Sequence, residues 1–143
     1  MIQTEGLSID DLNKWGTGNM IGLLGIEFVE VTQEYIKARM PVDSRTVQTF
    51  GYLHGGASVS LAETIGSIGA NFSVDREKFH CVGLEINANH IRVVKEGWVY
   101  ATARPLNVGR KFQVWEIKIE NKEGKLVCVC RLTMAVMEGK AGF

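Results

Sequence analysis

The chain is poor in cysteine and proline, and it has no excess of charge of either sign. Its 143 residues include 3 cysteines and 2 prolines, and 16 basic residues balance 16 acidic ones. Balanced charge gives no electrostatic case for nucleic acid or an acidic membrane, so we expect neither as a partner. The cysteines, Cys81, Cys128 and Cys130, lack C-x-x-C spacing and indicate neither a disulfide framework nor a zinc site.

Long apolar runs and targeting signals are also missing. No apolar run approaches the ~20 residues that span a bilayer. Residues 1–5 lack the basic and then apolar pattern of a signal peptide, so we expect a cytoplasmic protein. His54, His80 and His90 have no ligand spacing, and we therefore expect no metal site.

The remaining pattern predicts one α+β domain over residues 1–143, since no repeat or linker divides it. Ser8 begins a capping box and predicts a short helix, whereas four glycines between 16 and 25 predict irregular chain. A long helix is expected over 55–74, and residues 43–53 are expected to form a loop. Six strands are expected, at 26–32, 34–41, 80–91, 97–105, 109–120 and 125–137, with Gly124 in the hairpin turn between the last two.

The final strand, 125–137, differs from the one before it. Residues 115–120 alternate apolar and charged side chains, which is typical of a strand with one dry face. Residues 126–132 are apolar on both faces apart from Arg131, which predicts cover on both sides. We expect the long helix to cover one face of the sheet and a second subunit to meet the other.

The predicted long helix contains a single carboxylate, Glu63. Between Arg45 and Asp75 the only ionisable groups are His54 and Glu63, so the helix is expected to be buried nearly all round. A lone acid there either reaches solvent at an edge or serves as a nucleophile or general base. We favour catalysis, because natural chains seldom keep an unpaired buried acid without a use.

The helix is expected to begin at His54-Gly55-Gly56. Free N–H groups at a helix N-terminus can polarise a carbonyl oxygen, and the alternative is that these residues serve only to make the turn. Gly55 and Glu63 are eight residues apart, or ~12 Å along a helix. One carbonyl cannot contact both, so this chemistry predicts a composite site in a dimer. The small-residue side of the helix, Val59, Ala62 and Gly66, is expected to face the partner's helix.

Several motifs together resemble the hotdog-fold acyl-CoA thioesterases. They are most similar to the branch that includes the dihydroxynaphthoyl-CoA thioesterases of menaquinone and phylloquinone biosynthesis. The similarity extends from about residue 20 to 136. The motifs lie at 40–46, Gln48, 51–59, 61–63, 83–90 and 113–115.

The resemblance implies a hotdog fold, with one long central helix packed on a six-stranded antiparallel sheet, and a set of catalytic residues. Glu63 matches the carboxylate that acts as nucleophile or base, and Gly55 matches the N–H donor to the thioester carbonyl, with His54 beside it. Gln48 matches a residue that orients the thioester or water, and Ser67 a hydroxyl near the acyl group. The composite site predicts a homo-oligomer, and the apolar outer face of 125–137 favours a dimer of dimers. We expect no cofactor apart from the coenzyme A of the substrate.

It also implies where coenzyme A lies. Phosphates need basic side chains or free N–H groups, which suits Arg92, Arg110 and Lys111. Asn107 stands where relatives often have histidine, and Lys111 where another polar residue is expected. The implied positions are Gly83, His90, Ile91, Arg92, Val93, Asn107, Val108, Gly109, Arg110 and Lys111.

We therefore predict hydrolysis of an aromatic acyl-CoA, of hydroxynaphthoyl or hydroxybenzoyl type. The alternatives are a hotdog hydratase or dehydratase and a non-catalytic acyl-CoA-binding module. A dehydratase would need a histidine near 49–51, where there is none, and a binding module would lack the acid at 63. Parts of 15–24, 50–53 and 64–72 are expected to line the acyl pocket.

Overall fold

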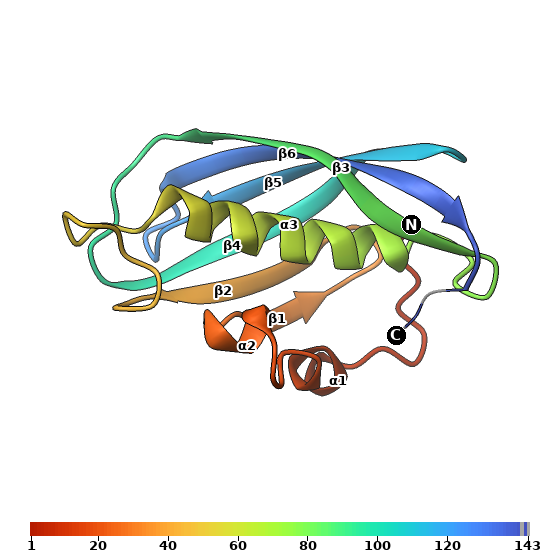
Figure 1. Cartoon of the computed structure of the whole chain (residues 1–143), viewed down its shortest axis with the longest axis horizontal. Helices are drawn as coiled ribbons and strands as arrows, with labels where there is room; N and C mark the ends of the chain where they lie inside the picture. The colour runs from red at the N-terminus through yellow and green to blue at the C-terminus, as the bar shows by residue number, and fades with distance from the viewer. Residues whose placement is uncertain (141, 143) are drawn as a thin grey trace.

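A six-stranded antiparallel sheet holds one long helix against one of its faces (Figure 1). This computed structural model describes residues 1–140 and 142. Helix α3 (Gly55–Asn71) lies across the sheet, whose strand order is β1-β2-β4-β5-β6-β3. The predicted α+β hotdog architecture is confirmed. The strands are β1 Glu27–Val31, β2 Ile36–Val42, β3 Phe79–His90, β4 Gly97–Val108, β5 Phe112–Glu120 and β6 Leu126–Glu138.

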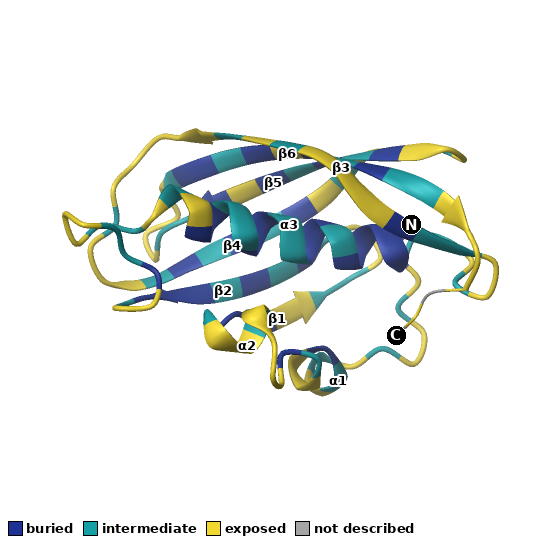
Figure 2. Ribbon diagram, in the orientation of Figure 1, coloured by how far each residue is buried: buried dark blue, intermediate teal, exposed yellow. Residues whose placement is uncertain are grey.

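The core lies between α3 and the sheet, as the alternating pattern of β5 predicts. Trp115, Ile117 and Ile119 are fully buried there. Gly124 takes φ +75 in the turn between β5 and β6, a conformation that costs glycine little. Figure 2 shows that buried segments run along α3 and along the central strands beside it.

The small-residue side of α3 packs on the chain's own sheet. A Cβ added at Gly66 would lie 2.6 Å from a methyl of Leu132, and one added at Gly69 would lie 2.7 Å from the Trp115 ring. These glycines let the helix approach bulky sheet residues. The prediction that Ala62 and Gly66 face a partner's helix is therefore wrong, because large β5 and β6 side chains fill that space.

The opposite side of α3 is only half-buried in the single chain. It consists of Val59, Ser60, Glu63, Thr64 and Ser67. The prediction that the helix is buried nearly all round is therefore wrong for one chain. This stripe is without charge apart from Glu63, unlike the solvent face of an ordinary surface helix.

Strand β3 is an edge of the sheet, hydrogen-bonded to β6 on one side. Its exposed side chains include Leu84, which is 64% exposed at a shift in register between Gly83 and Glu85. On the outer face of β6, Val129 is half-buried and Arg131 is exposed. Val127, on the same face, is buried. The cover of this face by a second subunit stays a prediction.

The N-terminal region is more regular than predicted. Ser8 caps α1 (Ile9–Lys14) as expected, but a second helix, α2 (Met20–Leu23), replaces the predicted irregular chain. Asn19 forms it by accepting the Ile21 N–H. The long helix also ends three residues earlier than predicted. No helix within residues 1–140 and 142 is both long and apolar enough to cross a bilayer.

Candidate active site

Glu63 lies midway along α3 and its carboxylate is unpaired. It makes neither a hydrogen bond nor an ion pair with any residue among 1–140 and 142, although the side chain is half-buried. It approaches β3 at a position without a side chain, since a Cβ on Gly83 would lie 2.7 Å from its Oε1. Both oxygens of the carboxylate are therefore free of hydrogen bonds to the described residues.

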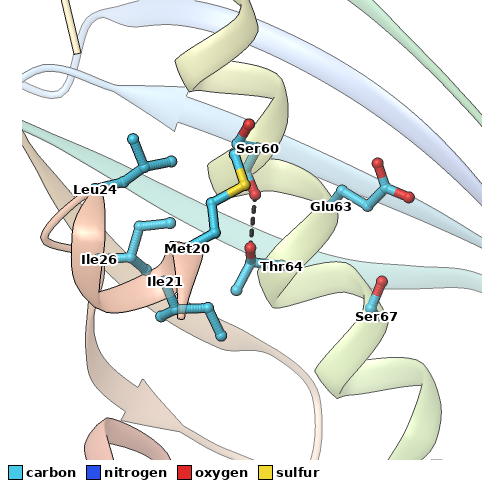
Figure 3. A pocket seen from close by; sticks show the side chains of 8 residues that line it. All are labelled: Met20, Ile21, Leu24, Ile26, Ser60, Glu63, Thr64 and Ser67. Atoms are coloured by element: carbon cyan, nitrogen blue, oxygen red, sulfur yellow. Dashed lines mark hydrogen bonds between the residues drawn. The ribbon is translucent and has the colours of Figure 1, made fainter. Parts of the chain in front are cut away.

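A cavity of about 430 Å³ adjoins Glu63. Met20, Ile21, Leu24 and Ile26 form an apolar wall from α2 and the residues after it. Opposite them, α3 supplies Ser60, Glu63, Thr64 and Ser67 (Figure 3).

Two hydroxyls of the α3 wall are already engaged as donors. The Ser60 hydroxyl donates to the Gly56 carbonyl at 2.8 Å, and the Thr64 hydroxyl donates to the Ser60 carbonyl at 2.7 Å. In Figure 3 Thr64 points toward the α2 wall, whereas Glu63 and Ser67 project from α3 on the side away from α2. Ser67 lies next to Met134, with Oγ 3.8 Å from the thioether sulfur.

The N-terminus of α3 has one engaged and one free donor. His54 caps the helix, because its Nδ1 accepts the Gly56 N–H at 2.7 Å. The Gly55 N–H finds no acceptor in the part of the chain that the structure describes. Among the predicted catalytic groups, His54 therefore has a capping role and Gly55 keeps a donor for a ligand.

The loop before α3 fixes Gln48. The side-chain oxygen of Gln48 accepts the Phe50 N–H, and the backbone N–H of Gln48 donates to the Tyr52 carbonyl at 2.8 Å. At the start of this loop the Arg45 guanidinium lies 2.8 Å from Asp43 and holds the pKa of that carboxyl below its usual value.

A second cavity, of about 260 Å³, joins this loop to the end of β3. The His90 ring lies directly on the helix start, since a Cβ added at Gly55 would fall 2.8 Å from its Nε2. Six predicted site residues meet here: Gln48, Gly55, His90, Ile91, Arg92 and Val93.

Five of the remaining predicted coenzyme A residues, 107–111, lie far from that cavity. They belong to the end of β4 and the turn into β5. Phe112, which follows this turn, pairs with Ala135 of β6, and Ala135 pairs with Val82 of β3, so the turn lies on the Val82 side of the sheet. From Val82 to His90 is eight residues of strand, or roughly 26 Å. One chain therefore does not bring residues 107–111 together with Arg92.

The predicted acyl-pocket residues coincide in part with the lining of the larger cavity. Residues 20, 21 and 24 line the larger cavity, as do 64 and 67, whereas residues 50–53 do not and Leu53 lines the second cavity. Ser60 and Ile26 were missed. Ser60 could have been found from its position three residues before Glu63, which places both on one side of a helix.

This fold and this site define a class, the hotdog thioesterases. An acidic side chain projects from the central helix beside a ligand-sized cavity, and a free N–H marks the start of the same helix. The chain belongs to the thioesterase superfamily, whose family model matches residues 50–128. The predicted resemblance and the predicted thioester hydrolase are confirmed.

Individual relatives match nearly the whole chain. It is 47% identical over 137 residues to the 1,4-dihydroxy-2-naphthoyl-CoA hydrolase of Escherichia coli K12, which covers 96% of this chain and 100% of that protein. A thioesterase structure from Haemophilus influenzae superposes with a TM-score of 0.92 at 46% identity, covering 96% of each chain. A mutant thioesterase structure from Pseudomonas aeruginosa superposes with a TM-score of 0.93 at 44% identity. The match covers 96% of this chain and 99% of that chain.

Proposed function

We propose that the protein hydrolyses an aromatic acyl-CoA, of hydroxynaphthoyl or hydroxybenzoyl type, to the free acid and coenzyme A. The observation that carries this proposal is the unpaired carboxylate of Glu63, a residue that lines a cavity of about 430 Å³. A cavity of this size, with one apolar wall and a few polar groups, suits an aromatic ring bearing hydroxyls. The naphthoyl-CoA substrate in the name of the E. coli relative supports a naphthoyl substrate.

In the proposed reaction Glu63 acts as nucleophile, or as the base that takes a proton from water. Addition at the thioester carbon turns the carbonyl oxygen into an oxyanion, which the free Gly55 N–H stabilises by a hydrogen bond. When Glu63 is the base, collapse of the tetrahedral intermediate expels the coenzyme A thiolate, which takes up the proton that Glu63 removed from water. When Glu63 is the nucleophile, the collapse leaves an anhydride between Glu63 and the acyl group. Water then hydrolyses this anhydride to the free acid and the restored carboxylate and supplies the proton of the thiol. Gln48, close to Gly55 in the second cavity, orients the thioester or the water.

The proposed site is composite. Gly55 and Glu63 lie ~12 Å apart along α3, so a carbonyl polarised by one and attacked through the other needs two chains. The half-buried stripe of α3 offers a surface for the second copy. The unpaired edge of β3 offers a further contact to that copy.

Antiparallel pairing of two β3 edges also accounts for the divided coenzyme A residues. A twofold axis at mid-strand brings the His90 end of one β3 beside the start of the partner's β3. Arg92 of one subunit then meets residues 107–111 of the other, on a single nucleotide. We propose a homodimer built in this way, and a dimer of dimers as the complete assembly. Each subunit is one domain that acts in the cytoplasm without a cofactor.

Thiol release from a panel of aryl and aliphatic acyl-CoA substrates tests the proposed reaction. We expect the hydroxyaryl thioesters to give the highest kcat/KM without added metal or nucleotide. Glu63→Ala should lower kcat by ~10² to 10⁴ and leave the fold intact. Absence of release across the panel, together with hydration of an enoyl-CoA, would replace this proposal with the hydratase alternative. Full activity of Glu63→Ala would remove Glu63 from the chemistry.

A further inference from the structure

Gly83 of β3 meets the free end of Glu63. A Cβ added there would lie 2.7 Å from Oε1 and 3.8 Å from Cδ of Glu63, and the third nearest atom is the Met134 sulfur at 4.0 Å. Real side chains essentially never make a carbon–oxygen contact of 2.7 Å. The carboxylate therefore occupies space that any other residue at position 83 would fill.

The backbone gives no separate reason for glycine at this position. Seven glycines of the described chain have positive φ, and Gly83 is not one of them. Gly83 sits in regular pairing with Met134, immediately before the shift in register that leaves Leu84 without a partner residue. Alanine would fit this backbone, so the collision with Glu63 is the steric reason for a missing side chain.

The helix is fixed relative to the strand close to this point. The side chain of Asn71, two turns beyond Glu63, accepts the Cys81 N–H at 2.8 Å and donates to the Cys81 carbonyl at 3.1 Å. Asn71 is buried, and Cys81 lies two residues before Gly83 on β3. This paired hydrogen bond holds α3 against β3, so a new side chain at 83 cannot be accommodated by separating the two elements.

We infer that Gly83 is a positioning residue for Glu63. Its missing side chain lets the carboxylate lie against the edge strand, in the position from which it reaches the thioester. The inference rests on the proposed function of Glu63 and goes beyond the predicted contact of Gly83 with coenzyme A. A side chain added at position 83 would collide only with the mobile end of Glu63. The substitution should therefore lower turnover without disturbing folding.

Gly83→Ala tests the inference through kcat, KM, the melting temperature and a crystal structure. A misplacement near 1 Å can cost ~10²-fold, so we expect kcat to fall by ~10- to 100-fold with KM nearly unchanged. The melting temperature should stay the same or rise slightly, because alanine restricts the unfolded chain. The crystal structure should show the Glu63 carboxylate displaced and the α3 and β3 backbones unmoved.

The Glu63→Asp variant is the control in which to repeat the Gly83→Ala substitution. The carboxylate of Glu63→Asp is one methylene shorter and withdraws from position 83, so Gly83→Ala added to it should change kcat by less than two-fold. A raised KM at unchanged kcat would leave Gly83 a substrate contact and overturn the inference. So would an unfolded Gly83→Ala protein, or an undisplaced carboxylate in its structure. If the wild-type protein releases no thiol, the proposed function fails, whereas the crystal structures still decide whether Gly83 positions Glu63.

Discussion

The role of the Gly55 N–H can be isolated with two substitutions at one position. Gly55 is the first residue of α3, where proline is tolerated because its missing N–H has no partner within the helix. The preceding residue, His54, has φ −70 and ψ 130, which is the extended conformation that a following proline requires. Gly55→Pro therefore removes the donor and keeps the helix, whereas Gly55→Ala keeps both.

The comparison of the two variants cancels their common steric effect. Any added Cβ at this position meets the His90 ring at 2.8 Å, so alanine and proline both displace that ring. The ratio of their kcat values then reports the lost donor. Removing one oxyanion donor costs ~10² to 10³ in kcat, or about 2.7–4 kcal/mol, so Gly55→Pro should be slower than Gly55→Ala by that factor.

The assay is the release of coenzyme A thiol from an aryl-CoA at saturating substrate, with melting temperatures recorded for both variants. Similar melting temperatures would show that proline has not broken the helix. Equal kcat values for the two folded variants would refute the assignment, because the N–H would then contribute nothing to the transition state. The oxyanion would have to be stabilised by another donor.

Three further predictions concern the assembly, the nucleotide and the thiols. Inactive Glu63→Ala and inactive Gly55→Pro proteins, unfolded together and refolded at equal amounts, should recover roughly a quarter of their active sites. Half of the dimers are mixed, and one of the two sites in each mixed dimer is intact. Mass spectrometry checks that mixed dimers form, and no recovery in proven mixed dimers means that each site lies within one chain. Arg110→Ala should raise KM for an acyl-CoA at nearly unchanged kcat, because it removes a remote contact that binds substrate and transition state alike. The hydrolysis of a pantetheine thioester should be unaffected. An equal loss of kcat/KM on the two thioesters would make Arg110 a structural residue. Burial raises the pKa of the Cys81 thiol from 9.0 to about 11, so the unfolded chain loses this proton first and the free energy of unfolding should fall as pH rises from 9 to 11. Urea denaturation across that range should show a smaller decline for Cys81→Ala, and an identical decline would contradict the assignment to Cys81.

The fold could be predicted because each local signal agreed with the global arrangement. Alternation over 115–120, the glycine turn at 124 and the nearly uncharged segment around Glu63 are all determined by short-range pattern, and the structure confirms them. The short α2 could not be found in this way. It has only four residues and depends on the N-cap Asn19. The glycines on both sides of this segment predict irregular chain instead.

Which neighbour faces a given side of α3 could not be predicted. Ala62 and Gly66 indicate a close approach of some other element, but the sequence does not say whether that element is a strand or a second helix. The structure places Leu132 there. The separation of the predicted coenzyme A residues within one chain could not be predicted for the same reason. The distance between Arg92 and the 107–111 turn depends on strand order and not on spacing in the chain.

The two walls of the larger cavity differ in how firmly the fold holds them. The α3 wall belongs to a helix that is packed against five strands. The facing wall is a four-residue helix on which Met20 is 58% exposed and Leu23 is 70% exposed. Substitutions in α2 remove little buried surface, whereas changes along α3 disturb the core. Under the proposed function, residues 20–24 are therefore the part of the cavity wall that can change with the acyl group at the least cost in stability.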